Sequence, residues 1–512
     1  MPAYRSIIAL RHHPATAWNA RRAFHLFSIA LFAIAANGCA LRSTLESWGL
    51  FGARNADPAP TPRVSLHQAR PPEAHRFTIG SDQELFGTLR ALRIREGDTL
   101  PDVARHYGLG FEELAAANPG VDPWVPAPSS NVLVPLQFLL PNAPRKGIVV
   151  NLAAMRLFHF PSAGAGLEVV TYPVGIGREG RATPTGTLWI QRKKEHPTWF
   201  PTAQIRADHS RKGDPLPASV SPGPDNPLGD YAMYLSRQPY LIHGTNKPYS
   251  IGWRASNGCI RLYPENISQL FPSTPVKESV TIVNQPYLTG WRDGVLYLQA
   301  YRPQEELSAK VLQKRLRAEL RKIESARHHV LAWDRVDRIL DEARGIPLPI
   351  SAQSNAIDRT LAQALPLEHP WRFREQPEVP GDRPGAWDVL VDESVSQSTA
   401  RRLAAFLNHQ GPAIPARVRQ SGGHYQVLAG PYLTVREAKL SVRRLKIELE
   451  LTGRIIEPAP GLATGGATSG SVTGRSGSER SAGKNKTADA TPKQTFPNTT
   501  GCEMSRVEAK RC

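Results

Sequence analysis

The stretch YLIHGTNKPYSIGWRASNGCIRLYP, residues 240–264, places an imidazole and a thiol on either side of a loop. His243 ends an apolar run that is typical of a buried strand, and Cys259 follows in a turn that contains a glycine. The thiolate is the nucleophilic form of a Cys, and a neighbouring imidazole can accept the thiol proton. The pattern therefore predicts Cys259 as a nucleophile and His243 as its proton acceptor and donor.

The residues before the thiol have two interpretations. Gly258 has no Cβ, so it allows a substrate to approach the backbone closely, and nearby N–H groups can then hold an oxyanion. Ser256 and Asn257 either donate to that oxyanion or shape the turn, and we expect Asn257 to shape it. The structural alternative for the whole motif is a small buried Cys and an unrelated His, which is the commoner origin of such a pair.

Arg261 lies two positions after Cys259 on an extended segment, so the two side chains point to the same side. A guanidinium there can hold a substrate carboxylate through two parallel hydrogen bonds. An internal salt bridge that braces the loop is the alternative, and the sequence does not decide between them.

The stretch resembles the signature of the YkuD-type L,D-transpeptidases, which cross-link bacterial peptidoglycan. The likeness covers residues 147–284. Its upstream part is carried by YPVGIG (172–177), TPTG (183–186), PTW (197–199) and GPDNPLG (223–229). Many members have a second His directly after the motif Ser, where this chain has Asn257. The resemblance therefore implies that His243 is the base.

The resemblance also implies the reaction, without a metal or organic cofactor. Cys259 attacks the carbonyl before the terminal D-alanine of a tetrapeptide stem, and His243 takes the thiol proton and later protonates the leaving amine. The backbone carbonyl of Gly244 is expected to orient His243. A side-chain amine of a second stem then gives a 3→3 cross-link. Water as acceptor makes the enzyme a carboxypeptidase, and a Lys of an anchored lipoprotein makes it an attachment enzyme.

Several short strands without a long amphipathic helix predict a mostly β catalytic domain, a sandwich or barrel, over residues 147–284. Residues 89–140 predict a small βααβ module that resembles LysM, a binder of N-acetylglucosamine polymers; a helical spacer is the alternative. Residues 385–457 predict a β-α-β-β-α-β order, an α+β ferredoxin-like pattern. They resemble a SPOR domain, which binds glycan strands; a regulatory or dimerising module is the alternative.

The N-terminus predicts export. Arg21 and Arg22 precede an apolar run over 23–36 that has the length of a signal-peptide core, so residues 1–39 are interpreted as a signal peptide. A small residue before Cys39 resembles a lipobox, in which Cys39 is acylated and the chain becomes an outer-membrane lipoprotein. Plain cleavage and a short uncleaved anchor are the alternatives. We expect a periplasmic protein associated with the cell wall.

The remaining segments are expected to connect these modules. They are a linker (40–88), a helical connector (303–346), a Pro-rich linker (347–384) and a disordered tail (461–512) that contains Cys502 and Cys512, for which we have no function. The formal net charge of +18 predicts an anionic partner. A cell-wall polymer with free carboxylates or an anionic membrane surface fits it, and nothing in the sequence resembles a nucleic-acid-binding motif.

Two functions from different classes remain open at this point. One is the transpeptidase, and the other is a catalytically idle scaffold whose ends bind glycan. The intact set of His243, Cys259 and Arg261 favours the enzyme. A sortase-like Cys transpeptidase is a more distant alternative, because the motif context of sortases is missing.

Overall fold

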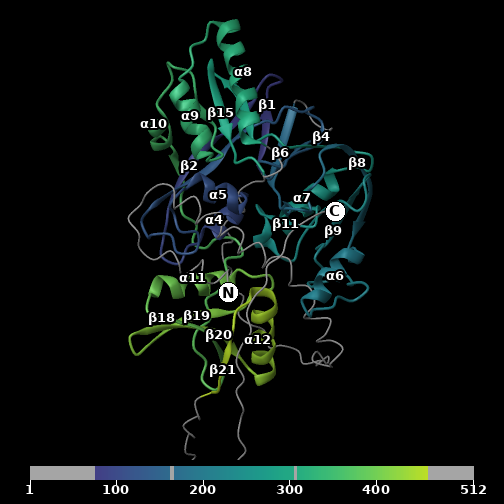
Figure 1. Cartoon of the computed structure of the whole chain (residues 1–512), viewed down its shortest axis with the longest axis vertical. Coiled ribbons are helices and arrows are strands. Elements are labelled where there is room, and N and C mark those ends of the chain that lie inside the picture. The colour runs from purple at the N-terminus through teal and green to yellow at the C-terminus, as the bar shows by residue number, and fades with distance from the viewer. Residues whose placement is uncertain (1–74, 162–166, 305–307, 459–512) are drawn as a thin grey trace, which may run out of the picture. The chain divides into compact units, whose positions relative to one another are not determined.

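The computed structural model describes residues 75–161, 167–304 and 308–458 (Figure 1). The predictions about the signal peptide, Cys39, most of the 40–88 linker and the tail from 461 onward lie outside these residues. No helix within the described ranges is both long and apolar enough to cross a membrane.

A nine-stranded, mixed sheet forms the centre of the catalytic region. Its strands, in their order across the sheet, are β1 (Arg76–Ile79), β6 (Leu167–Pro173), β5 (Arg156–Phe160), β4 (Gly147–Asn151), β13 (Ser279–Val283), β8 (Gly186–Glu195), β9 (Tyr231–Leu235), β10 (Leu241–His243) and β12 (Ile260–Arg261). Strands β7 (Ile176–Gly177) and β11 (Arg254–Ser256) form a separate, parallel two-stranded sheet. The prediction of a mostly β catalytic domain is confirmed.

Two helices of this region were not expected from the sequence. They are α6 (Ala203–Arg211) and α7 (Pro264–Ser273), and a 3₁₀ turn, η1 (Pro248–Ser250), lies between β10 and β11. The polar sequence of α6 has no apolar stripe, but Thr202 caps it by accepting a hydrogen bond from the N–H of Ile205 (3.3 Å). Helix α7 buries Ile267, Leu270 and Phe271 in the core beneath the sheet.

The N-terminal module consists of β2 (Leu85–Arg93), α4 (Leu100–His106), α5 (Phe111–Ala117) and β3 (Asn131–Leu139), with β2 and β3 antiparallel. Thr99 caps α4, because its side chain accepts a hydrogen bond from the N–H of Asp102. The module does not have a core of its own: Phe86 and Leu100 belong to one apolar cluster with Val149 and Phe158 of the catalytic sheet. Strand β1 pairs with β6, so the end of the expected 40–88 linker is part of the catalytic sheet.

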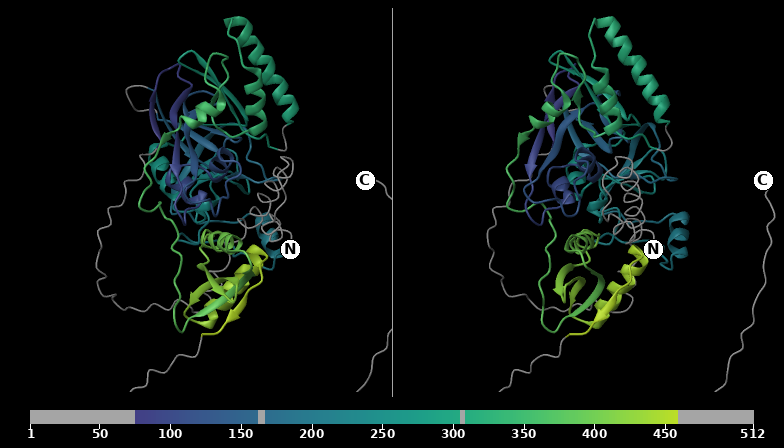
Figure 2. Two further views of the ribbon diagram at one scale, coloured as in Figure 1. Left: turned by 90° about the vertical axis from the view of Figure 1, so that its left-hand side faces the viewer. Right: turned by 60° about the vertical axis from the view of Figure 1, so that its left-hand side comes forward.

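Residues after the catalytic sheet form more structure than a connector and a linker. Strands β14 (Tyr287–Arg292), β15 (Val295–Ala300) and β16 (Leu348–Pro349) make a sheet, and α8 (Ala309–Arg327), α9 (Trp333–Glu342) and α10 (Ile357–Ala362) accompany it (Figure 2). Buried side chains of these strands and helices share one apolar cluster. A short strand, β17 (Leu365–Pro366), pairs with β2. The segment predicted as a Pro-rich linker (347–384) therefore forms secondary structure with buried side chains, instead of an extended, exposed chain.

The C-terminal domain has the element order β18 (Trp387–Ser394), α11 (Gln397–Asn408), β19 (Ala416–Ser421), β20 (His424–Tyr432), α12 (Val435–Leu449) and β21 (Arg454–Ile456). Its antiparallel sheet has the order β19-β20-β18-β21. Ser396 caps α11, and Thr434 with Glu437 forms a capping box at the start of α12. Both helix starts follow from local sequence.

Candidate active site

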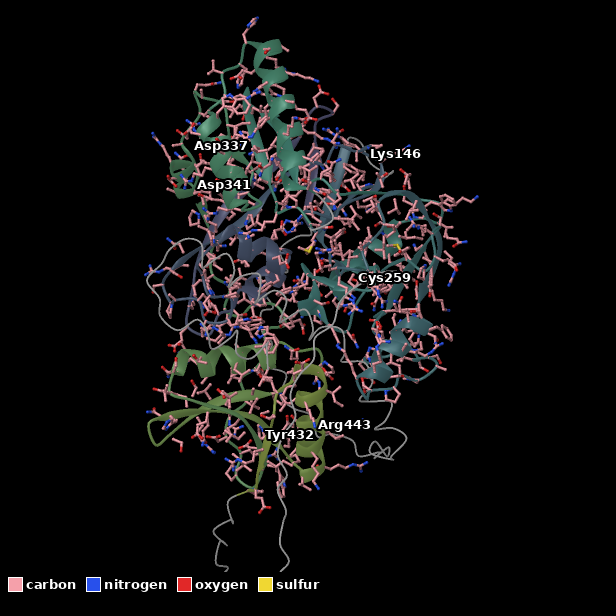
Figure 3. All side chains as sticks on the ribbon, in the orientation of Figure 1. Lys146, Cys259, Asp337, Asp341, Tyr432 and Arg443 are labelled. Carbon is pink, nitrogen blue, oxygen red and sulfur yellow. The ribbon has the colours of Figure 1, made fainter. Side chains whose placement is uncertain are left out.

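Strands β10 and β12 bring His243 and the Cys259 segment together. The two strands are parallel, with Ile242 opposite Ile260 and His243 opposite Arg261. Cys259 immediately precedes β12, and the same register places it opposite Leu241. Because side chains alternate along a strand, Cys259, Arg261 and His243 lie on one face of the sheet. Figure 3 shows the position of Cys259 on the ribbon.

Hydrogen bonds within the turn fix the backbone ahead of the thiol. The Ser256 hydroxyl donates to the carbonyl of Cys259 (2.6 Å) and accepts the N–H of Gly258 (3.1 Å). Ser256 is 1% exposed. These contacts indicate that Ser256 shapes the turn, and they occupy the Gly258 N–H that the sequence offered as an oxyanion donor.

Gly258 adopts a conformation that requires glycine. Its φ is +106°, and a Cβ at this position would lie 2.6 Å from Cε1 of Tyr240. Sequence reasoning missed Tyr240 as part of the site, since only the fold packs its ring against the turn.

Thr183 supports the turn from a different segment of the chain. Its hydroxyl donates to the carbonyl of Gly258 (3.0 Å) and accepts the N–H of Gly177 (2.9 Å). The N–H of Arg178 also donates to the carbonyl of Ser256 (3.0 Å). Thr183 and Gly177 both lie in upstream segments that the sequence pattern had singled out, but their contacts with the turn come from the tertiary fold.

Cys259 is partly exposed, and its Sγ lies 3.8 Å from the carbonyl oxygen of Pro239. Burial of the sulfur raises the pKa of the Cys259 thiol, and the N–H of Leu241 and the charge of Arg261 oppose this shift. The resting group is therefore the neutral thiol, which needs a base before it can attack.

His243 is 3% exposed, and burial lowers its pKa to about 3. The charge of Arg261 acts in the same direction, while the carbonyls of Gly244 and Leu228 oppose it. Among the described residues, none meets the buried Nδ1 in good hydrogen-bond geometry. The ring is therefore neutral near pH 7 and able to accept a proton.

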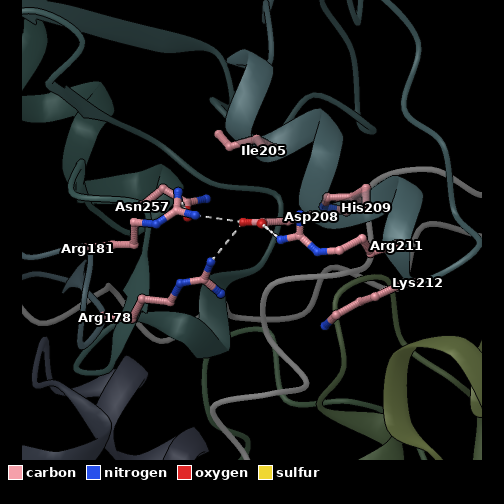
Figure 4. Close-up of a pocket in the computed structure, with 8 residues that line it drawn as sticks. All are labelled: Arg178, Arg181, Ile205, Asp208, His209, Arg211, Lys212 and Asn257. Carbon is pink, nitrogen blue, oxygen red and sulfur yellow. Dashed lines mark hydrogen bonds and ion pairs between the residues drawn. The ribbon is translucent and has the colours of Figure 1, made fainter. Parts of the chain in front are cut away.

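A cavity of about 400 Å³ adjoins the turn of residues 256–259, which we call the catalytic turn (Figure 4). It is lined by Arg178, Arg181, Ile205, Asp208, His209, Arg211, Lys212 and Asn257. Asn257 connects it to the turn, since its Oδ1 lies 3.5 Å from Nη1 of Arg181. Sequence reasoning missed Asp208 and Arg211 because they lie on the unexpected helix α6, and Arg178 and Arg181 because only the tertiary fold brings them to the cavity. Within the described ranges, no group of three or more His, Cys, Asp or Glu side chains is arranged to hold a metal ion.

Comparisons with known proteins identify the family of this region. The family model for the L,D-transpeptidase catalytic domain matches residues 145–282, and that for the SPOR domain matches residues 384–453. "Probable L,D-transpeptidase ErfK/SrfK" of Escherichia coli (strain K12) is 41% identical over 237 residues, which are 46% of this chain and 73% of that protein. Its namesake of Salmonella typhimurium is 37% identical over 297 residues, 56% of this chain and 92% of that protein.

A solved structure, the catalytic domain of the L,D-transpeptidase of E. faecium, is 21% identical and covers 28% of this chain and 99% of its own, with a TM-score of 0.22. The family assignment rests on the sequence matches rather than on this likeness. The chain belongs to the L,D-transpeptidase family and carries a C-terminal SPOR domain.

Proposed function

We propose that the protein is a cysteine L,D-transpeptidase that acts on the tetrapeptide stems of peptidoglycan. The observation that carries the proposal is the register of β10 and β12, which puts the Cys259 thiol and the His243 imidazole on one face of the sheet. Family membership supports the reaction class, and the shared face of Cys259 and His243 supports their roles as nucleophile and base.

In the proposed reaction, His243 accepts the thiol proton as Sγ of Cys259 attacks the carbonyl before the terminal D-alanine. The C–N bond then breaks, and His243 returns the proton to the leaving amine of D-alanine. Burial keeps the ring neutral before the attack but also makes it a weak base, so the proposal requires the charge of the forming Cys259 thiolate to stabilise the imidazolium. A side-chain amine of a second stem attacks the acyl-enzyme, and the 3→3 cross-link forms as the thiol is regenerated.

Two positioning roles belong to the same proposal. The carbonyl of Gly244 favours the protonated form of His243, which suits a group that orients the ring during proton transfer. Arg261 lies opposite His243 in the strand register, where a guanidinium can bind a substrate carboxylate.

The flanking domains support retention on the cell wall. The SPOR domain is proposed to bind glycan strands, and the N-terminal βααβ module to bind them as a LysM module does. Together with the signal peptide that the sequence predicts, these domains support a periplasmic enzyme, and acylation of Cys39 would attach it to the outer membrane.

The test is mass spectrometry of muropeptides after incubation with the purified protein. We expect release of D-alanine and a mass that corresponds to a 3→3 dimer. Cys259→Ala should abolish both, and a carbapenem should add covalently to the wild type but not to this variant. Trimmed monomers without dimers would instead indicate a carboxypeptidase.

Pelleting with sacculi provides the matched control. Cys259→Ala should pellet as the wild type does, since the nucleophile is remote in sequence from both flanking domains. A wild type that pellets but forms no carbapenem adduct and releases no D-alanine would contradict the enzyme and leave a glycan-binding scaffold.

A further inference from the structure

The cavity beside the catalytic turn gathers positive charge around one carboxylate. Asp208 accepts hydrogen bonds from Arg181 (Nη2–Oδ2, 2.9 Å), Arg178 (Nη2–Oδ2, 3.3 Å) and Arg211 (Figure 4). Arg178 and Arg181 come from the segment after β7, whereas Asp208 and Arg211 come from α6. Two parts of the chain far apart in sequence therefore converge on this point.

The cationic side chains of the cavity outnumber its acidic ones. Four cations line it, with Asp208 as the carboxylate among the lining residues that the structure describes. The other titratable lining group, His209, contacts Asp214 instead (Nδ1–Oδ2, 3.3 Å). Burial, and then the charge of Arg181, lower the pKa of Arg178, and burial and then Arg178 lower that of Lys212. An anion that enters the cavity would relieve this repulsion.

The cavity contacts the turn before Cys259, but the side chains proposed to react do not line it. Asn257 is a lining residue, and the N–H of Arg178 donates to the carbonyl of Ser256. Neither Cys259 nor His243 lines it. A group bound here would therefore lie beside the bond that breaks, not at it.

We propose that this cavity is a carboxylate subsite that positions a stem peptide through a free carboxylate remote from the scissile bond. The inference rests on the proposed function and names the group by which its substrate is held. Arginine presents planar, paired donors that fit a carboxylate, and a volume of about 400 Å³ admits a carboxylate together with part of a peptide. The donor stem and the acceptor stem both carry such carboxylates, so the experiment distinguishes them.

The experiment compares tetrapeptide stems that have free carboxylates with stems amidated at those positions. Arg211→Gln and Lys212→Gln remove charges at the exposed end of α6, so they spare the hydrogen bonds of the catalytic turn. For each variant we expect the preference for acid over amide, measured as kcat/KM, to fall about tenfold, with the loss in KM, because a charge-assisted contact disappears. Lys212→Arg should retain the preference, and Lys310→Gln on α8 should not change it.

Two assays identify the stem. D-alanine release at varied donor concentration reports the donor, and cross-link formation at varied acceptor concentration reports the acceptor; the preference should fall in one of them. A preference unchanged in both assays, or equal losses for acid and amide stems, would overturn the subsite. A wild type without D-alanine release would contradict the proposed function instead. In that case, calorimetric titration of the same peptides into the same variants tests the subsite, and equal affinities for acid and amide would reject it.

Discussion

The two ends of the catalytic sheet differ in how a buried charged group is paired, although each end also buries one imidazole nitrogen without a partner of good geometry among the described residues: Nε2 of His159 on β5 and Nδ1 of His243 on β10. At the β4–β6 end, the guanidinium of Arg156 is 1% exposed, yet it is satisfied on all sides. It binds Glu113 through two contacts (2.6 and 3.0 Å), the hydroxyl of Thr171 (3.2 Å) and the carbonyl of Gly108 (3.3 Å). At this end of the sheet, the hydrogen-bond network around Arg156 stabilises a single packed conformation.

At the β10–β12 end, one buried imidazole nitrogen lacks a partner of good geometry in the part of the chain that the structure describes, and the turn takes a backbone conformation that glycine adopts without strain but other residues do not. His243 buries its Nδ1 away from hydrogen-bond partners of good geometry among the described residues, and Gly258 has a φ that side chains rarely adopt. A buried polar atom without a partner costs stability and persists where the surrounding structure holds it in place. The comparison teaches that the buried charge at the β4–β6 end is fully paired, whereas the β10–β12 end holds the thiol and imidazole that we propose to react.

The largest effect is expected at the β4–β6 end of the sheet. Glu113→Gln leaves the Arg156 charge buried without its counter-ion, which should lower the free energy of unfolding by about 3–5 kcal/mol. Chemical denaturation followed by tryptophan fluorescence measures it. Asp358→Asn, which removes an exposed ion pair with Arg338, is the control and should leave the midpoint unchanged. Equal shifts in the two variants would contradict the special status of the buried pair.

At the β10–β12 end, Gly258→Ala should lower kcat/KM about 100-fold, because displacing the turn moves Cys259, the proposed nucleophile, out of position. The added Cβ meets both the unfavourable φ and the Tyr240 ring. D-alanine release measures the effect. Gly97→Ala is the matched control, since Gly97 also has a positive φ (+90°) but nothing lies within 4 Å of the added Cβ. A fully active Gly258→Ala enzyme would show that the turn tolerates displacement.

A third prediction concerns the β4–β6 end and how the free energy of unfolding changes at acid pH. Burial, and then the charge of Arg76, lower the pKa of His159 from 6.5 to about 4. Between these pH values the unfolded chain binds a proton that the folded chain does not, so stability falls as the pH decreases from 6.5 to 4. The contribution of this His is about 1.4 kcal/mol per pH unit.

His159→Phe should remove that contribution, so that the free energy of unfolding changes less steeply over the same window. Denaturant titrations at several pH values measure the slope. Carboxylates that titrate in this range affect the wild type and the variant alike. An unchanged slope would mean that His159 is protonated in the folded state.

The smallest effect is expected for Thr183→Val, which keeps the shape of the side chain and removes its hydrogen bonds to Gly258 and Gly177. Losing such contacts should lower kcat/KM about tenfold. Thr185→Val, at an exposed position of the same segment, should behave as the wild type. If both variants are equally active, the turn does not depend on Thr183 for its position.

The sequence predicted the elements whose signals are local. The apolar run that ends at His243 indicated a strand, which is β10, and the caps Thr99 and Ser396 are local features at the starts of α4 and α11. The Cys259 and His243 pair was also readable, because their spacing around a glycine-containing loop belongs to one continuous stretch. Helix α6 was missed because its polar sequence has no periodic apolar face, although Thr202 offered a capping signal.

The sequence by itself therefore determined which reactive groups are present, a thiol and an imidazole, and which strands and turn carry them. Only the tertiary structure decided their state. Burial keeps the imidazole of His243 neutral, packing against Tyr240 makes Gly258 obligatory, and the approach of α6 encloses a basic cavity beside the turn. The reason is physical: desolvation, close contact and charge repulsion depend on groups distant in sequence, which no local pattern specifies.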